Sequence, residues 1–463
     1  MVVQHNMQAA NANRMLNVTT SAQSKSTEKL SSGYKINRAA DDAAGLTISE
    51  KMRKQIKGLD RASTNAEDGV SAVQTAEGAL TEVHSMLQRM NELATQSANG
   101  TNSNTDRKAI QDEIDQLTTE IDRVSETTKF NETYLLKGDG AEKAHNVNAH
   151  DAGIGGVTLS DKGDTVDVTL KELKAGDKIS IAGKNYTIGA EAKDGQALVT
   201  GQAQADKTIT VNGTTYTYDT TNKWTDGKGN KVNIGTGAQD GEIKIGAGDV
   251  VSNGTKTLTV MKDANAADGI DDNDSTVITA KKAYQLETAE ILKASNIGTD
   301  TAATADKNTG ALDDATNKFT LTKGKVNYND ALSFNLHVGA DADMTNKITV
   351  NIDSMNSAGL GVKGIKADTE QDATYAIDAI ADAISTVSSQ RSALGAVQNR
   401  LEHTINNLDN VVENTTSAES RIRDTDMAEE MVNYSKNNIL AQAGQSMLAQ
   451  ANQSNQGVLS LLQ

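Results

Sequence analysis

The chain has 463 residues, no cysteine and no proline, and only 3% of its residues are aromatic. Lack of cysteine excludes a disulfide framework, a thiolate metal site and a thiol nucleophile, and lack of proline excludes a polyproline ligand. The 45 basic and 62 acidic residues give a net charge of −17, which argues against nucleic acid as a partner because phosphate binding needs a basic face. No segment is long and apolar enough to predict a membrane span, and the N-terminus lacks the pattern of a cleaved secretory signal.

Both ends of the chain are predicted to be helical, starting with the N-terminal side. After a first step of seven from Val73, apolar residues recur at steps of three and four up to residue 94 and again over 110–124, the spacing of a coiled-coil seam. The segment between these runs, 99–104, reads as a tight turn, with Thr105 expected to cap the next helix and Asp106 in its first turn. The seam positions are Val73, Leu80, Val83, Leu87, Met90 and Ala94, then Ile110, Ile114, Leu117, Ile121 and Val124.

The outermost segments, 1–34 and 420–463, are rich in Ala, Asn, Gln and Ser and carry only thin apolar stripes. Because each buries little surface alone, we expect them to order only against each other and against neighbouring chains. Basic residues of the first segment are expected to face acidic residues of the last. The stripes are Met7, Met15, Val18 and Ala22, then Met427, Met431, Tyr434, Leu448, Leu459 and Leu462; the charged residues are Arg14, Lys25 and Lys29 against Asp424, Asp426, Glu429 and Glu430.

The centre of the chain is predicted to be β-rich. Residues 1–140 hold 8 and residues 377–463 hold 3 of the 37 glycines, so the middle holds most of them, as turn-rich structure requires. Alternating segments at 166–170, 179–181 and 257–260 predict strands. Residues 208–211 and 214–218 flank Asn212-Gly213 and predict a hairpin with a type I′ turn.

A long helix over 371–417 is expected to follow this centre. Its apolar positions keep the same spacing of three and four, and Arg391 occupies the one seam position that they skip. The fold class is therefore α+β multidomain: paired coiled-coil terminal segments around an inserted β-rich outer domain. The seam positions are Ile377, Ile380, Ile384, Val387, Leu394, Val397, Leu401, Ile405, Leu408 and Val412.

No catalytic or metal-binding constellation emerges. Gly359 to Gly364 match G-x-G-x-x-G, but the glycines do not stand directly between a strand and a helix, so we expect a turn. The acidic cluster Asp268 to Asp274 lacks calcium-loop spacing, and His145 and His150 do not form H-E-x-x-H. We therefore expect no enzyme activity, no cofactor and no metal.

The two ends resemble bacterial flagellin, the major subunit of the flagellar filament. The resemblance rests on Asn11–Arg14 and Ser26–Leu46 at one end, and on Leu394–Leu401, Ala418–Asp426 and Gln442–Leu462 at the other. It implies an inner-tube helical domain from 1–40 and 420–463. It also implies an outer-tube domain from 41–140 and 331–419, with about 190 inserted residues, 141–330, forming one or more exposed β-rich domains.

The resemblance also implies function and partners. It implies a homopolymeric filament for motility, located outside the cell and exported without a cleaved signal through the flagellar type III channel, with an export chaperone and a cap complex as partners. The terminal segments expected to carry assembly include Arg14, Leu30, Arg421, Ile422, Leu461 and Leu462.

Recognition by the vertebrate Toll-like flagellin receptor is a further implication of the resemblance, at Arg89, Leu93 and Glu113. Two alternatives remain open at this point. One is a hook–filament junction protein, which shares terminal helices. The other is an adhesin or receptor-ligand role for the β-rich centre.

Overall fold

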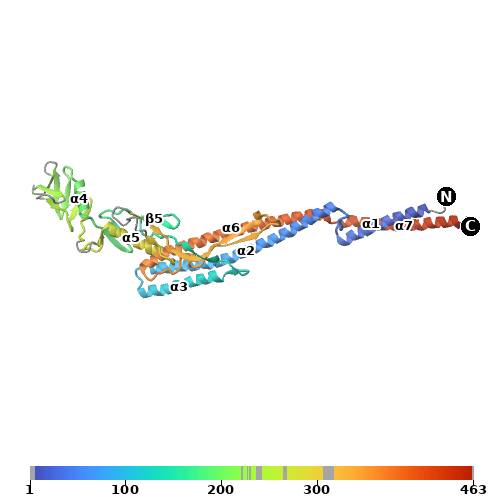
Figure 1. Cartoon of the computed structure of the whole chain (residues 1–463), viewed down its shortest axis with the longest axis horizontal. Coiled ribbons are helices and arrows are strands. Elements are labelled where there is room, and N and C mark those ends of the chain that lie inside the picture. The colour runs from blue at the N-terminus through green and yellow to red at the C-terminus, as the bar shows by residue number, and fades with distance from the viewer. Residues whose placement is uncertain are drawn as a thin grey trace. The chain divides into compact units, whose positions relative to one another are not determined.

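The computed structural model describes residues 6–219, 223–226, 228, 231–235, 242–263, 268–305 and 317–460. Its α-helices are α1 (Met7–Ser32), α2 (Ala43–Ser97), α3 (Asn104–Thr127), α4 (Ala192–Gly201), α5 (Ala280–Ser295), α6 (Glu370–Arg423) and α7 (Met427–Ser460). The chain forms two compact units. The first comprises residues 1–71, 334–350 and 396–463, and the second comprises residues 72–333 and 351–395. Both α2 and α6 are therefore divided between the two units. The α+β expectation is confirmed (Figure 1).

The strands lie between α3 and α6 in sequence. They are β1 (Lys129–Phe130), β2 (Thr133–Tyr134), β3 (Asp139–Asn146), β4 (Thr158–Asp161), β5 (Thr165–Thr169), β6 (Lys178–Ile181), β7 (Lys184–Ile188), β8 (Thr208–Val211), β9 (Thr214–Asp219), β10 (Lys223–Asp226), β11 (Lys231–Gly235), β12 (Glu242–Lys244), β13 (Val250–Ser252), β14 (Thr257–Thr259), β15 (Val277–Ile278), β16 (Thr304–Ala305), β17 (Lys318–Thr322), β18 (Lys325–Asp330), β19 (Leu332–His337) and β20 (Lys347–Ile352).

The first unit contains the paired helices α1 and α7 and the parts of α2 and α6 nearest to them in sequence. Leu59 and Ala62 of α2 pack with Leu408 of α6, and the next layer joins Ala66 to Leu401. The β19–β20 hairpin packs on this seam through Ile348. Gly69 allows this close approach, because a Cβ atom there would lie 2.2 Å from the Leu336 Cδ1 atom.

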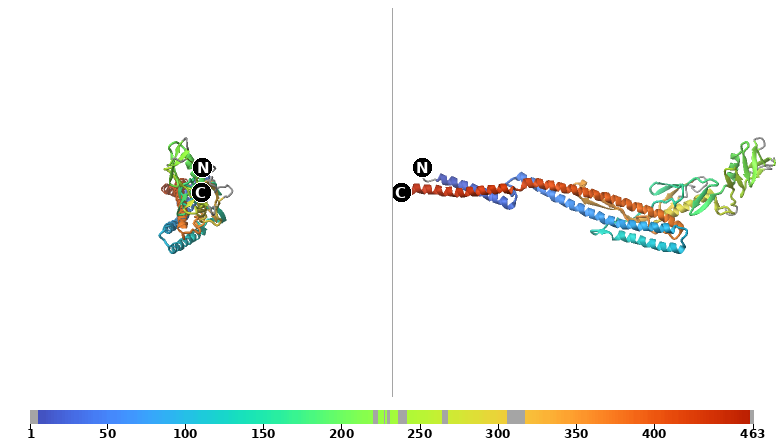
Figure 2. Two further views of the ribbon diagram at one scale, coloured as in Figure 1. Left: turned by 90° about the vertical axis from the view of Figure 1, so that its left-hand side faces the viewer. Right: turned by 180° about the vertical axis from the view of Figure 1, so that it is seen from behind.

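The second unit contains the remaining parts of α2 and α6 together with α3, which lie side by side (Figures 1 and 2). The predicted seam of α2 is fully buried from Val73 to Ala94, and Ile114 and Ile121 of α3 are buried as well. The long C-terminal helix extends over 370–423 rather than 371–417. Every predicted seam position on it is buried or half-buried, with the seven-residue series Ile380, Val387, Leu394, Leu401 and Leu408 innermost.

Arg391 occupies the polar position of this seam. Its guanidinium lies 3.8 Å from the Glu77 carboxylate of α2, and both side chains are about one-third exposed. A charged group is tolerated at this seam position because the long side chain reaches a partner at the edge.

The turn before α3 has a different cap from the one that the sequence suggests. Ser103, not Thr105, is the N-cap, and its hydroxyl accepts a hydrogen bond from the Asp106 N–H at 3.2 Å. The Asp106 carboxylate in turn accepts from the Ser103 N–H at 3.0 Å, which completes a capping box. The capping box satisfies two N–H groups at the start of the helix, whereas Thr105 lies too far into the first turn to do so.

The glycine motif at 359–364 forms turns packed against α3. Asp122 of α3 accepts hydrogen bonds from the Ser357 N–H at 2.7 Å and the Ser357 hydroxyl at 2.9 Å. Gly361 and Gly364 have positive φ angles of 73° and 64°, which glycine adopts without strain. The segment therefore connects β20 to α6, as the turn interpretation requires.

The inserted region contains two apolar cores. One core joins the four-stranded sheet β16-β17-β5-β4, the three-stranded sheet β15-β7-β6 and helix α5, with Val168 and Ile291 at its centre. The other lies under the seven-stranded sheet β12-β11-β10-β9-β8-β13-β14, around Trp224 and Val251. The predicted strands at 166–170, 179–181 and 257–260 are present within one residue, as β5, β6 and β14.

The β8–β9 hairpin has the predicted turn. Val211 pairs with Thr214 across it, and Asn212 and Gly213 have φ angles of 49° and 80°. Positive φ at both central residues is the requirement of a type I′ turn. The sequence therefore specified this hairpin through local turn chemistry.

The start and end of the inserted region pair with each other. β3 and β18 form an antiparallel ladder from Asn146↔Lys325 to Asp330↔Asp139. The Val147 N–H also donates to the Gly324 carbonyl at 2.9 Å. The inserted residues therefore leave and rejoin the chain at one two-stranded stem. The five-part domain scheme stays a prediction: its division at 40/41 falls in the α1–α2 loop, and its division at 419/420 falls inside α6.

Helix α5 carries a buried carboxyl group in this region. Glu287 is only 1% exposed, and neither of its carboxyl oxygens has a hydrogen-bond partner among the described residues. Burial raises the pKa of this carboxyl group to about 7, because the charged form loses its hydration. Glu287 is therefore protonated at mildly acidic pH.

Helix α5 should consequently be less stable at high pH. The pKa of Glu287 in the folded state lies above its value in the unfolded chain. Its full contribution to the free energy of unfolding is therefore present below about pH 4.5. This contribution falls by about 3 kcal/mol as the pH rises to about 7. Hydrogen exchange of α5 amides at pH 5 to 8 measures this change. Glu287→Gln, which keeps the group neutral, should remove the pH dependence. The control Glu142→Gln, which changes an exposed carboxyl group, should retain the pH dependence. Equal pH dependence in the two variants would show that Glu287 is not its source.

Candidate functional site: the outer faces of helices α1 and α7

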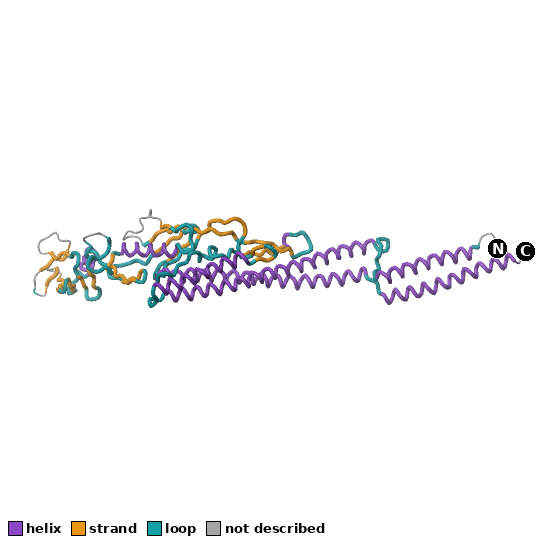
Figure 3. The backbone as a smooth tube through the Cα atoms, turned by 90° about the horizontal axis from the view of Figure 1, so that it is seen from below, coloured by secondary structure: helices purple, strands orange, loops and turns teal. Residues whose placement is uncertain are grey.

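Helices α1 and α7 form an isolated pair with no strand beside them among the described residues (Figure 3). The Asn6 side chain caps α1 by accepting from the Ala9 N–H at 3.0 Å. Asp426 begins α7 in the same way, accepting from the Ala428 and Glu429 N–H groups at 2.9 and 3.1 Å. Gly33 ends α1 with a φ angle of 75° and donates its N–H to the Lys29 carbonyl, a left-handed helix end that favours glycine.

The faces on which the two helices meet are made largely of small and polar residues. Leu16 packs against Gly444, where an added Cβ atom would lie 3.4 Å from the Leu16 Cδ1 atom. Few large apolar groups are removed from water, so this contact alone stabilises the pair weakly. The half-buried or buried positions include Ala9, Ala12, Leu16, Thr19, Gln23, Ser26 and Leu30 on α1 and Glu430, Tyr434, Asn437, Ala441, Gly444, Leu448 and Ala451 on α7.

Larger apolar side chains lie on the opposite, outer faces. Met7 and Met15 of α1 are 68% and 61% exposed, and Val432 and Ile439 of α7 are 68% and 67% exposed. Several large apolar side chains exposed on one pair of helices indicate an interaction site. We call this set the outer apolar face: Met7, Met15, Val18, Met427, Met431, Val432, Ile439, Leu440 and Met447.

The sequence stripes are divided between the two faces. Met7, Met15, Val18, Met427 and Met431 lie on the outer apolar face. Tyr434 and Leu448 lie on the inner face instead, and Ala22 is half-buried, while the side chains of Leu459 and Leu462 lie outside the described part of the chain. Val432, Ile439, Leu440 and Met447 were not among the predicted stripe residues, although their spacing of seven, one and seven residues indicates a second stripe rotated from the first.

The structure places four of the six expected assembly residues. Arg14 and Arg421 are exposed, whereas Leu30 and Ile422 are half-buried. Leu461 and Leu462 lie outside the described residues. The assignment of these six residues to assembly stays a prediction.

The expected charge pairing between the ends is only partly present. Lys29 lies 3.7 Å from Glu430, the buried acid of the inner face. Lys25 instead lies 3.9 Å from Asp41 in the α1–α2 loop, and the Arg14 guanidinium bonds to Asn11. One ion pair therefore connects α1 to α7 among the described residues, since Lys25 and Arg14 have other partners.

A junction not anticipated from the sequence holds the pair at its other end. The Lys35 N–H donates to the Arg423 carbonyl at 2.6 Å, and the Thr425 N–H donates to the Gly33 carbonyl at 3.0 Å. The Arg423 guanidinium lies 4.8 Å from the centre of the Tyr34 ring and 2.9 Å from Glu50. This guanidinium lowers the pKa of Glu50 below its usual value.

The expected receptor-recognition residues lie in the second unit, on α2 and α3. The Arg89 guanidinium donates to the Glu113 carboxylate at 2.9 Å and to Glu92 at 3.2 Å, and the three side chains are half-exposed. Leu93 is 2% exposed and belongs to the helix seam. The structure therefore brings Arg89 and Glu113 together at the surface and places Leu93 beneath it.

The described residues contain no group of three His, Asp or Glu side chains placed to hold a metal ion. Among the same residues, no helix is long and apolar enough to cross a membrane. The exposed apolar side chains of α1 and α7 suit association with other protein surfaces.

Comparisons with known proteins identify the family of the chain. The family model of the bacterial flagellin N-terminal helical region matches residues 3–141, and that of the C-terminal helical region matches residues 377–462. A flagellin of Clostridium tyrobutyricum is 41% identical over 98% of this chain and 100% of its own length. Flagellin D of Vibrio cholerae is 35% identical over 99% of each chain.

A solved structure of FliC from Burkholderia pseudomallei is 19% identical, covers 72% of this chain and 99% of that one, and has a TM-score of 0.27, too distant a likeness to bear on the fold. The family models account for α1, α2, α3, α7 and nearly all of α6. The two curated relatives extend the likeness across the inserted region to the full length. With the helical ends matched and identity above 30% over whole chains, this protein belongs to the bacterial flagellin family.

Proposed function

We propose that this flagellin, a structural subunit of the extracellular flagellar filament that self-assembles into a homopolymer, associates with neighbouring copies through the outer apolar face of α1 and α7. The observation that carries the proposal is the distribution of apolar side chains on this pair. Leu16 and Gly444 meet on the inner face, while Met15 and Ile439 remain mostly in water. A single chain gains nothing from that arrangement, whereas a polymer removes the outer face from water.

The hook–filament junction alternative is not favoured, because flagellins match this chain over its full length. An adhesin role for the β-rich centre is not favoured either. The terminal helices, rather than the insert, carry the matched family models.

The finer steps of delivery belong to the same proposal. We infer export through the flagellar type III channel, an export chaperone bound to the C-terminal segment, and guidance by a cap complex. A chaperone has a physical role here, because the exposed side chains of α7, including Met431 and Ile439, would otherwise associate before export.

Receptor recognition is proposed at Arg89 and Glu113. These two half-exposed side chains form one ion pair on the surface of α2 and α3, and charged pairs of this kind provide specificity to a complementary surface. Leu93 is buried, so its contribution is to hold the α2 seam rather than to present its own side chain.

Substitution on the outer apolar face should impair assembly without unfolding the subunit. Ile439→Gln should remove about 2 kcal/mol of favourable burial free energy when one subunit joins the polymer. This loss raises the critical concentration for polymerisation by about 30-fold. Sedimentation measures that concentration, and circular dichroism checks that helix content is unchanged. Ser392→Gln, at an exposed polar position of α6 that does not belong to the outer apolar face, serves as the control and should assemble normally. Unchanged assembly of Ile439→Gln would exclude this residue from the interface.

Deletion of the inserted domain should spare assembly. The β3–β18 stem allows a direct closure, in which Val147 is joined to Gly324 through Asn-Gly, the turn already present at 212–213. Electron microscopy of the purified variant should show filaments. Combining the deletion with Ile439→Gln should lose them again. A soluble, helical deletion variant that forms no filaments would show that residues 148–323 carry essential contacts.

Charge removal at the proposed receptor site should weaken recognition. Arg89→Ala and Glu113→Ala should each raise the half-maximal concentration for receptor activation by about tenfold or more, as measured with monomeric protein on receptor-expressing reporter cells. Arg123→Ala provides the control, because Arg123 is an equally exposed arginine of α3 paired with Glu120. Equal loss in all three variants would show a nonspecific effect of surface charge.

A further inference from the structure

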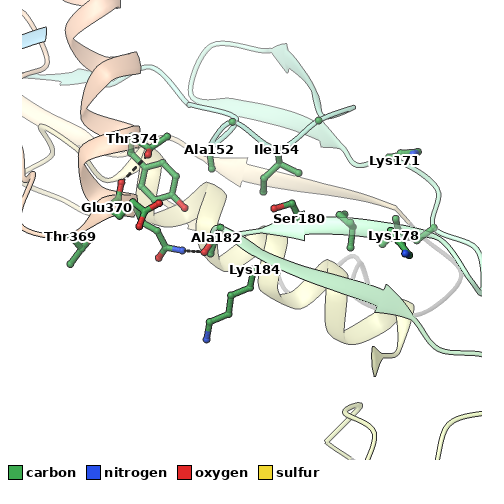
Figure 4. A pocket seen from close by; sticks show the side chains of 17 residues that line it. Ala152, Ile154, Lys171, Lys178, Ser180, Ala182, Lys184, Thr369, Glu370 and Thr374 are labelled. Carbon is green, nitrogen blue, oxygen red and sulfur yellow. Dashed lines mark hydrogen bonds between the residues drawn. The ribbon is translucent and has the colours of Figure 1, made fainter. Parts of the chain in front are cut away.

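A pocket of the second unit lies between the 152–155 loop, the β6–β7 hairpin and the start of α6 (Figure 4). Polar groups at its α6 end already bond to protein atoms. The Gln371 side-chain amide donates to the Ala182 carbonyl, and the Thr374 hydroxyl donates to the Glu370 carbonyl. These groups are not free to hold a ligand, whereas α1 and α7 expose side chains that can react chemically.

Methionine supplies all the sulfur of this chain, which has 12 methionines and no cysteine. Peroxides convert a methionine thioether to the sulfoxide, so exposure decides which methionines react. Met344, between β19 and β20, is exposed. The other exposed methionines in the part of the chain that the structure describes all lie on the outer apolar face: Met7, Met15, Met427, Met431 and Met447.

The remaining described methionines are shielded. Met90, Met261 and Met355 are buried, and Met52 and Met86 are half-buried. Among the described side chains of α1 and α7, no buried or half-buried position is a methionine. Oxidation of the exposed methionines therefore leaves the contact between α1 and α7 intact and changes only their outer apolar face.

The reaction with hydrogen peroxide needs no other reactant. The methionine sulfur attacks one peroxide oxygen, the O–O bond breaks, an S–O bond forms, and the other oxygen leaves as water. The sulfur is oxidised and the peroxide is reduced. The product carries a polar oxygen that accepts hydrogen bonds, and burying such a group without a donor is unfavourable.

We propose that the methionines of the outer apolar face form a peroxide-sensitive modification site, at which conversion to the sulfoxide prevents a free subunit from joining the polymer. This inference rests on the proposed function, because it requires that the face be buried between copies. Five of the nine residues of the face are methionines, so one oxidant makes more than half of its residues polar. Burial protects the same side chains in subunits that have already assembled.

Treatment of the full-length monomer with hydrogen peroxide, followed by seeding, tests the proposal. We expect sulfoxide at the five methionines of the face by peptide mass spectrometry and unchanged helix content by circular dichroism. The critical concentration for polymerisation should rise about tenfold or more. An unchanged critical concentration after full oxidation of the face would overturn the proposal.

Enzymatic repair tests the modification without any substitution. Methionine sulfoxide reductases A and B each reduce one sulfoxide epimer, so the two enzymes together should restore assembly. Assembly that stays lost after mass spectrometry shows full reduction would assign the damage to another reaction.

Substitution by leucine, which conserves apolar volume, identifies the methionines responsible. A variant with leucine at all five methionines of the face should assemble within about twofold of the parent chain and should be unaffected by peroxide. The matched control combines Met52→Leu, Met86→Leu and Met344→Leu outside the face and should remain sensitive to peroxide. Equal sensitivity of the two variants would place the effect elsewhere and overturn the proposal.

Ile439→Gln distinguishes failure of this inference from failure of the proposed function. If that variant assembles poorly while the oxidised parent chain assembles normally, only the methionine proposal fails. If both assemble normally, the outer apolar face is not buried between copies and both proposals fail.

Discussion

The structure depends on narrow apolar seams that no helix can bury alone. Val73 to Ala94 of α2, Ile114 and Ile121 of α3, and the seven-residue series of α6 each form one apolar stripe that is buried only because other segments pack on it. A long helix with a narrow stripe is stable in water only when such packing exists. Proline inside these helices would cost about 3 kcal/mol at each position, which accounts for its absence from them.

In α1 and α7 the apolar side chains are only partly buried within one chain. Their inner faces pair through small and polar groups, and their larger apolar groups remain outside. The strong seams of the first unit, around Leu59 and Leu401, are complete within one chain. The rest of the subunit is folded by helices that bury one another's apolar side chains. On this account, assembly completes the same kind of packing for α1 and α7, because neighbouring copies bury the apolar side chains that remain exposed in one chain.

Helix periodicity and turn chemistry were sufficient to predict the helical ends, the α6 seam and the Asn212-Gly213 hairpin. These features depend on local spacing, which is visible in one sequence. The division of α7 into an inner face with Tyr434 and an outer face with Ile439 was not predicted, because apolar residues lie around much of this helix. The two cores of the insert and the buried Glu287 depend on contacts between distant segments. Sequence spacing carries no signal for them.

The central claim is that the outer apolar face becomes buried between copies. Hydroxyl-radical footprinting of methionine oxidation in the monomer and in the assembled filament tests it most directly, because Met15, Met431 and Met447 all lie on that face and are 54% to 61% exposed in the single chain. The account predicts rapid oxidation of these three side chains in the monomer and strong protection in the filament. Equal oxidation of all three in both states would contradict it.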